Sequence, residues 1–199
     1  MTTLEVPRGR LEAHALTREP WLRRVDLTLG AGELAVLRGP SGSGKSLLLR
    51  ALADLDPREA GDLHLDGVDA RELPPGHWRQ QVRLVAQRPP ILAPTVRGVL
   101  DLASELSGSA RLETPPGLRE DLAVARLSGG EAQLLALWTA LRSPAAVLLL
   151  DEPTSAMDPA LAARAEGWVL EWARAGGAVL WVSHDEDLAA RLGAREVRL

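Results

Sequence analysis

The chain has 199 residues, of which 46% are hydrophobic and 25% charged, and its formal net charge at pH 7 is −4. This balance is typical of a soluble globular domain and excludes a disordered or fibrous chain. The absence of cysteine excludes disulfides, thiolate metal sites and a cysteine nucleophile. The acidic balance gives no global basic field for nucleic-acid phosphates, so we expect no nucleic-acid partner.

The first elements predict a β-rich region that leads into a loop and a helix. Alternating apolar and polar residues predict strands over 11–16, 25–29 and 33–37. The third strand enters a glycine-rich turn at 39–44, and leucines and alanines then predict a buried helix over 45–55. A strand, a loop and a helix in this order are the context of a phosphate-binding loop.

Further strands and a looser helical region follow. Strands are predicted over 61–67 and 81–86, and residues 89–126 contain short amphipathic pieces such as 95–106. The last third alternates helix and strand, in the order 131–141, 146–150, 159–175, 178–182, a short helix, and 195–199. Such alternation predicts a parallel sheet with helices on both faces. The longest apolar run, 145–150, is far shorter than the roughly 18 residues that span a membrane.

Residues 39–46, Gly-Pro-Ser-Gly-Ser-Gly-Lys-Ser, match the phosphate-loop pattern G-x-x-x-x-G-K-[ST]. Its glycines let backbone N–H groups converge on phosphate oxygens at a helix N-terminus. Lys45, the chain's single lysine, would reach the β- and γ-phosphates as a compact charge, a task to which a planar guanidinium is poorly suited. A chance glycine turn is the alternative, which the strand and helix on either side disfavour. The predicted nucleotide contacts here are Gly39, Pro40, Ser41, Gly42, Ser43, Gly44, Lys45, Ser46 and Leu47.

Two acids follow the apolar strand predicted at 146–150. Asp151 is placed where a carboxylate can hold Mg²⁺ through water beside Ser46. Glu152 is the general-base candidate, because a carboxylate within reach of the attacking water can orient it and take its proton. An acidic pair after a strand is by itself more often an ordinary loop start, and it is the upstream phosphate loop that favours catalysis.

Residues 127–131, Leu-Ser-Gly-Gly-Glu, resemble the signature motif that separates ABC ATPases from other phosphate-loop enzymes. Other family elements occur in family order: Gln87 in Val-Ala-Gln, Ser-Ala-Met-Asp at 155–158, and His184 in Val-Ser-His-Asp. The resemblance covers nearly the whole chain. It implies an α/β fold: a P-loop NTPase core of ABC type with an N-terminal antiparallel β subdomain and a small helical subdomain.

The same resemblance implies a domain division. The chain, 1–199, is expected to form a single ABC ATPase domain. Residues 1–88 and 127–199 would form the β subdomain with the RecA-like core, and residues 89–126 the helical subdomain.

The resemblance also implies a homodimer that closes on ATP, with each nucleotide between one phosphate loop and the opposite signature. Ser128 and the N–H groups of Gly129 and Gly130, at the start of a helix expected from Glu131, would bind the other subunit's ATP.

Other roles come from the same resemblance. Gln87 would touch Mg²⁺ or the attacking water, His184 would contact the γ-phosphate, and Asp158 would bridge the dimer interface. Glu152, His184 and Lys45 form the expected catalytic set, and Ser46, Gln87 and Asp151 the expected Mg²⁺ set.

Four positions depart from the family pattern. Leu47 stands where a hydroxyl residue commonly helps to hold the α-phosphate. The adenine-stacking aromatic is expected near Leu16, and the nearest candidate is Trp21. Glu131 replaces the commoner glutamine, and Leu134 stands where an arginine is frequent.

By family resemblance, a separate membrane permease docks on the helical region, which places the protein in the cytoplasm as a peripheral subunit on the inner face of the cell membrane. Because the chain ends 15 residues after His184, we expect no fused membrane or regulatory domain. Residues 78–82, 85–89 and 179–185 resemble small ATP-binding subunits of bacterial iron exporters, while other substrates, and import, stay open.

Two alternative functions remain at this point. One is a soluble ABC ATPase in DNA repair or translation, a group that usually has long coiled coils or two cassettes in one chain. The other is a module that clamps on ATP and barely hydrolyses it, which Leu47 and the missing aromatic would suit.

Overall fold

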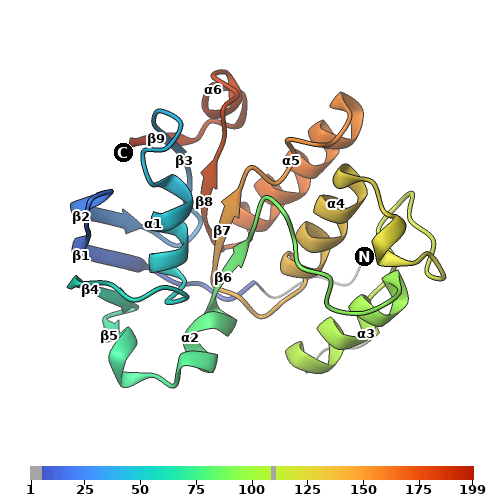
Figure 1. Ribbon diagram of the computed structural model, residues 1–199, viewed down its shortest axis with the longest axis horizontal. Helices are drawn as coiled ribbons and strands as arrows, with labels where there is room; N and C mark the ends of the chain where they lie inside the picture. The colour runs from blue at the N-terminus through green and yellow to red at the C-terminus, as the bar shows by residue number, and fades with distance from the viewer. Residues whose placement is uncertain (1–5, 109–110) are drawn as a thin grey trace.

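The computed structural model describes residues 6–108 and 111–199, and it contains two β-sheets and a set of helices (Figure 1). Residues 1–5 of the predicted core and residues 109–110 of the predicted helical subdomain lie outside the described part. The smaller sheet is antiparallel, with strand order β2-β1-β4-β5. Its strands are β1 (Leu11–Arg18), β2 (Leu22–Leu29), β4 (Ala60–Leu65) and β5 (Val68–Asp69).

The larger sheet has five strands in the order β6-β7-β8-β3-β9, and all their pairings are parallel. Its strands are β3 (Leu34–Arg38), β6 (Val82–Val85), β7 (Val147–Asp151), β8 (Ala178–Val182) and β9 (Arg195–Arg198). The predicted parallel sheet is therefore present. Strands β3 and β7, which lead into the phosphate loop and the two acids, lie on either side of β8.

The helices connect these strands and cover both faces of the parallel sheet. They are α1 (Lys45–Leu52), α2 (Pro75–Gln81), α3 (Val96–Ser107), α4 (Gly129–Ala140), α5 (Pro159–Arg174) and α6 (Leu188–Leu192), with short 3₁₀ turns at Ala70–Glu72 and Val124–Arg126. Figure 1 shows α1 between the two sheets and α4 and α5 on the opposite side of the parallel sheet.

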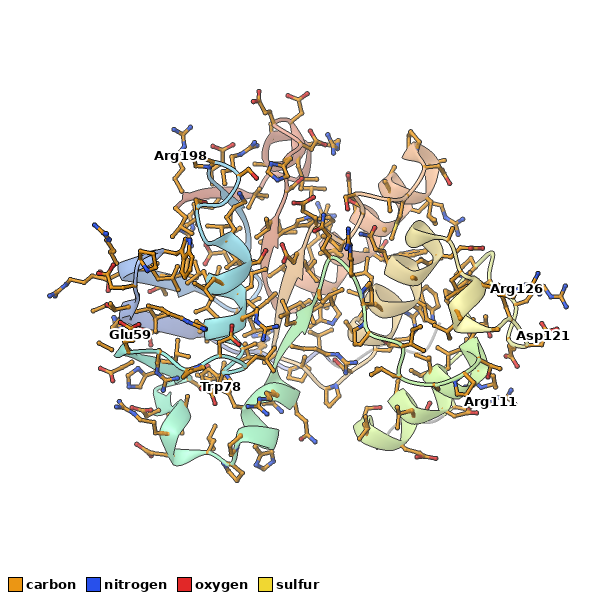
Figure 2. All side chains as sticks on the ribbon, viewed as in Figure 1. Glu59, Trp78, Arg111, Asp121, Arg126 and Arg198 are labelled. Carbon is orange, nitrogen blue, oxygen red and sulfur yellow. The ribbon has the colours of Figure 1, made fainter. Side chains whose placement is uncertain are left out.

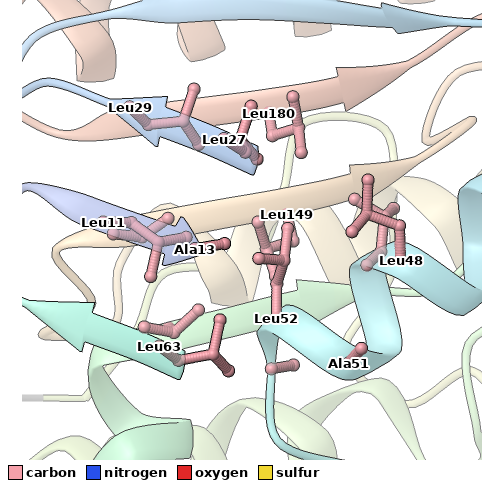
Figure 3. Packing of buried hydrophobic residues seen from close by; sticks show 14 of the residues in the cluster. Leu11, Ala13, Leu27, Leu29, Leu48, Ala51, Leu52, Leu63, Leu149 and Leu180 are labelled. Carbon is pink, nitrogen blue, oxygen red and sulfur yellow. The ribbon is translucent and has the colours of Figure 1, made fainter. Parts of the chain in front are cut away.

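The alternation of side chains along the parallel strands divides the core into two layers. In β7, Leu149 packs in the layer toward α1, whereas Leu148 and Leu150 pack in the layer toward α4 and α5. Figure 3 shows the first layer, in which leucines of the antiparallel sheet and of α1 meet Leu149 and Leu180. Burying each such leucine contributes about 1.5–3 kcal/mol. This packing fixes the start of α1, and with it the phosphate loop.

A third apolar cluster joins α3 to α4 and includes Trp138. Trp138 donates its indole N–H to the Glu113 carbonyl at 2.8 Å, and its ring meets Trp168 of α5 edge-on at 5.1 Å. The helical region is thus connected to the core. Arg111, Asp121 and Arg126 lie at its outer edge (Figure 2).

The structure differs from the predicted elements at several boundaries and contains one further helix. Helix α1 ends at Leu52, three residues before the predicted end at 55, and α4 begins at Gly129 and not at Glu131. Helix α2 was not predicted, because its one buried residue is Trp78, whose indole donates to the Leu52 carbonyl at 2.9 Å. No helix in residues 6–108 or 111–199 has the length and apolar character that crossing a membrane requires.

Candidate active site

The phosphate loop joins the end of β3 to the start of α1. Gly42 and Gly44 have φ values of 78° and 95°, a left-handed conformation that side chains with a Cβ rarely adopt. Gly39 is needed for space, since a Cβ there would lie 2.8 Å from the Leu199 carbonyl oxygen and from Ser43 Oγ. The spacing of the motif therefore follows from its backbone geometry.

Lys45, the first residue of α1, lies folded over this loop and is only 7% exposed. Its Nζ donates to the carbonyl oxygens of Gly39 and Pro40, both at 2.8 Å. An ammonium group has three N–H donors, so these two bonds leave one donor of Lys45 beside the loop to bind an anion. The role of Lys45 in triphosphate binding stays a prediction, and its ammonium group lies beside the phosphate loop.

A cleft of about 440 Å³ opens over the loop. It collects residues from five separate parts of the sequence: Trp21, Ser41, Gly42, Gly44, Lys45, Ser46, Leu47, Gln87, Asp151, Glu152, Val182 and His184. Six of the nine predicted phosphate-loop contacts, the expected Mg²⁺ set and the expected catalytic set therefore line one cleft, whereas Gly39, Pro40 and Ser43 are not among its lining residues.

Glu152 is held between two of the predicted site residues. Its Oε2 accepts a hydrogen bond from Gln87 Nε2 at 3.1 Å, and its Oε1 lies 3.1 Å from His184 Nε2. The backbone of Glu152 has φ 49°, the left-handed region that costs a non-glycine residue about 1–3 kcal/mol. A bond from Glu152 N–H to the Val182 carbonyl at 3.0 Å helps to keep this conformation.

The loop that carries His184 is fixed by two arginines. Arg191 of α6 bonds both to Asp185, next to the histidine, and to Glu166 of α5, the latter at 2.9 and 3.0 Å. The Arg191 hydrogen bond lowers the pKa of Asp185. Arg38 at the end of β3 donates to the Glu186 carbonyl. A second cleft, about 490 Å³, adjoins the first at Glu152 and His184.

The signature residues lie outside the lining of the phosphate-loop cleft. Ser128 is the N-cap of α4: its Oγ accepts from Glu131 N–H at 3.2 Å, and Glu131 Oε2 accepts from Ser128 N–H and Oγ–H at 2.8 Å each. The hydrogen bond from the Ser128 backbone N–H, and to a smaller extent the one from the Ser128 hydroxyl, lowers the pKa of the Glu131 carboxyl. A Cβ on Gly130 would lie 2.5 Å from the Ala156 carbonyl oxygen, so glycine is required there.

Asp158 also has a local role. It is the N-cap of α5, and its Oδ1 accepts a hydrogen bond from Leu161 N–H at 2.9 Å. Together with Ser128, Gly129, Gly130 and Glu131, it forms the part of the predicted site that this chain does not bring to its own phosphate loop.

The donor set of the cleft fits Mg²⁺. Ser46, Gln87 and Asp151 supply a hydroxyl, an amide and a carboxylate, which are the oxygen ligands that this ion prefers. Within residues 6–108 and 111–199, no three His, Cys, Asp or Glu side chains cluster as a metal cage.

One residue of the site, Gln133, was not predicted from the sequence, and the candidate Trp21 can now be placed. Gln133 of α4 is 3% exposed and bonds to the loops around Glu152, and its signal was a polar residue on the buried stripe of an apolar helix. Trp21, the nearest candidate in the sequence for the adenine-stacking aromatic, lines the phosphate-loop cleft and is 55% exposed.

The comparisons with known proteins agree with this geometry. The family model described as "ABC transporter" matches residues 22–155, about two thirds of the chain. The chain belongs to the ABC transporter family. ABC ATP-binding subunits work with transmembrane components, and membership implies ATP binding and ATPase activity.

Relatives in this family are named for transport in opposite directions. The chain is 36% identical over 178 residues to the probable iron export ATP-binding protein FetA of Escherichia coli (strain K12), covering 83% of this chain and 79% of FetA. It is 36% identical over 185 residues to the Fe(3+) ions import ATP-binding protein FbpC of Streptomyces coelicolor, covering 87% of this chain and 53% of that protein. It spans about a third of the length of two further Streptomyces relatives. Direction and substrate are therefore not determined by these ABC relatives.

A solved structure described as "Structure of ATP binding subunit of ABC transporter" has the same fold. It superposes with a TM-score of 0.81 at 25% identity, covering 95% of this chain and 85% of that chain. The predicted ABC-type α/β fold is confirmed.

Proposed function

We propose that this chain binds and hydrolyses MgATP as a homodimer and so drives a separate transmembrane permease. The observation that carries the proposal is the Glu152 carboxylate, which Gln87 and His184 hold in the same cleft as the phosphate loop.

Several residues of the cleft have a task in hydrolysis. The phosphate-loop N–H groups and Lys45 bind the phosphates, and Glu152 orients the attacking water. The water oxygen forms a bond to the γ-phosphorus, and the bond from that phosphorus to the bridging oxygen breaks. ADP leaves with the electron pair, and the water proton passes to Glu152. His184 and Gln87 position the carboxylate.

Ser46, Asp151 and Gln87 would hold the magnesium ion. The ion supplies Lewis-acid stabilisation of the charge on the phosphate oxygens when bound. Leu47, which packs partly against the core and lines the cleft, offers no hydroxyl to the α-phosphate. Trp21 lies beside the loop, with its Cβ 3.0 Å from where a Cβ on Gly44 would be, and we assign it to stacking on the adenine.

The signature residues support the dimer. Ser128 and Gly129 are exposed at the start of α4, outside the lining of their own cleft. Backbone N–H groups at a helix start bind anions, so a second copy's nucleotide is their natural ligand. Each active site would then be complete only in the homodimer, with Asp158 near the interface.

The division into a core (1–88 and 127–199) and a helical subdomain (89–126) remains our proposal. The exposed Ile91 and Leu92, 64% and 55% accessible, begin the helical part and suit contact with a membrane subunit. The protein would act on the cytoplasmic face of the membrane. Iron export is the transport activity that we favour, because the relative FetA is named for it.

The test is the Mg²⁺-dependent ATPase activity of the purified chain. Glu152→Gln should lower kcat by at least about 100-fold, the lower range for loss of a general base. Glu171→Gln makes the same chemical change on the exposed face of α5 and serves as the control. A Glu152→Gln protein that keeps wild-type turnover would exclude this mechanism, and a wild type that binds but does not turn over ATP would favour the clamping alternative.

A further inference from the structure

One buried glutamine connects the signature helix to the loops around the active site. Gln133 lies in the second turn of α4 and is only 3% exposed. Its neighbours on the helix, Leu134 and Leu135, are buried apolar residues. A polar side chain in such surroundings is costly unless its hydrogen bonds are satisfied, so its partners show what it does.

Both ends of the Gln133 amide are bonded. Nε2 lies 3.1 Å from the Gln87 carbonyl oxygen, 3.2 Å from the Glu152 carbonyl oxygen and 3.1 Å from Ser155 Oγ. Oε1 accepts from Ala156 N–H at 3.0 Å. The orientation of the amide follows from chemistry, since a backbone N–H can only donate and a carbonyl can only accept.

The loops that Gln133 joins carry the groups proposed for hydrolysis. Its bonds reach the backbone of Gln87 and of Glu152, whose side chains bond to each other at 3.1 Å. The Glu152 carbonyl also accepts from Ser155 N–H at 3.2 Å and Ser155 Oγ at 3.0 Å. These bonds fix the peptide that follows the left-handed φ of Glu152.

The same contact links the catalytic loop to the signature. Gln133 lies five positions after Ser128, the N-cap of α4. The first turn of α4 also touches the Ala156 backbone, against which Gly130 packs too closely for any Cβ. A movement of α4 would therefore displace residues 152–156.

We propose that Gln133 is a positioning residue that holds the Glu152 carboxylate and the Gln87 segment in a fixed position relative to α4, the helix that begins with the signature residues. This inference rests on the proposed ATPase function. Gln133 is not among the described residues that line the nucleotide cleft, so its loss should lower kcat and leave ATP affinity nearly unchanged.

The first test compares Gln133→Leu with Thr139→Val. Thr139 is a buried polar residue of the same helix, and its hydroxyl donates to the nearby Ala136 carbonyl at 2.9 Å. Gln133→Leu should lower kcat at least tenfold and change the Kd for ATP less than twofold, while Thr139→Val changes neither. A kcat within twofold of wild type, or a Kd that rises as much as kcat falls, would overturn the proposal.

A second variant, Gln133→Glu, keeps an acceptor for Ala156 N–H and replaces the donor. A buried carboxyl that faces carbonyl oxygens binds a proton more readily, and in that form it donates again. Its kcat, relative to wild type, should rise at least threefold as the pH is lowered from 8.5 to 6. A flat ratio contradicts the donor role of residue 133.

A third readout does not depend on turnover and so separates this proposal from the ATPase proposal. Hydrogen exchange of Ala156 N–H in the nucleotide-free chain should be at least tenfold faster in Gln133→Leu than in Thr139→Val. If wild type hydrolysed no ATP, the proposed function would fail and this exchange ratio would still decide whether Gln133 holds the loop. Equal exchange in the two variants would refute the positioning role.

Discussion

Trp21 offers a sharp test of how the chain holds its nucleotide. It lies in the turn between β1 and β2, lines the phosphate-loop cleft and is 55% exposed. Stacking of a base on an aromatic side chain contributes about 1–3 kcal/mol. Since 1.4 kcal/mol is tenfold in Kd, Trp21→Ala should weaken ATP binding roughly 5- to 140-fold.

The assay is titration calorimetry at one fixed Mg²⁺ concentration, with ATP and with inorganic triphosphate, which has no base. Trp21→Ala should bind triphosphate like wild type, because Lys45 and the loop N–H groups remain. Trp21→Phe keeps a ring and should recover most of the ATP affinity. Unchanged ATP affinity in Trp21→Ala, or an equal loss for triphosphate, would refute stacking by this residue.

Further predictions concern the start of α4. Glu131→Gln removes a carboxylate beside the proposed γ-phosphate site, and the ATP-dependent dimer should form with a Kd about two- to fivefold lower, measured by sedimentation, for ~0.3–1 kcal/mol of charge effect at a helix N-terminus. The pKa of Glu131 in the folded state is below its ordinary 4.5, so the ionised carboxylate stabilises the folded protein above pH 4.5, and this contribution is lost as the pH falls through the folded pKa. In acid unfolding, the difference in free energy of unfolding between wild type and Glu131→Gln should therefore change only below about pH 4.5. Gly130→Ala would place its Cβ 2.5 Å from the Ala156 carbonyl oxygen, and should lower the free energy of unfolding by about 1–3 kcal/mol. Gly129→Ala, whose Cβ would meet the Ala156 Cβ at 3.3 Å, should cost less in the same denaturant titration.

Much of the site was predictable because its chemistry is encoded in short segments. The phosphate loop needs glycines at fixed spacing beside Lys45, and the two acids follow an apolar strand. Neighbouring parallel strands end at the same edge of a sheet, so these segments meet once the sheet is assumed. The fold class followed from the same alternation of strand and helix.

Other features depend on contacts between distant residues, which the local sequence does not identify. Gln133 meets residues 46 and 19 positions away, and its sequence neighbours predict only a buried helix. The left-handed φ of Glu152 depends on the fold around it, since its N–H bonds to Val182 of the neighbouring strand.

Trp21 and α2 were hard to place for different reasons. Register shifts along the β1–β2 pairing mean that counting residues back from the phosphate loop does not identify the residue that reaches it. Helix α2 is short and mainly polar, and its single buried residue, Trp78, gives no periodic pattern.

In the proposed cycle, two copies of this chain close on ATP, and Glu152 then promotes its hydrolysis. Light scattering of purified Glu152→Gln with MgATP tests this most directly. We expect a monomer of 21.3 kDa without nucleotide and a dimer of twice that mass with ATP. With ADP the protein should stay monomeric. A Glu152→Gln protein that stays monomeric at saturating ATP, or that dimerises equally with ADP, would contradict the account.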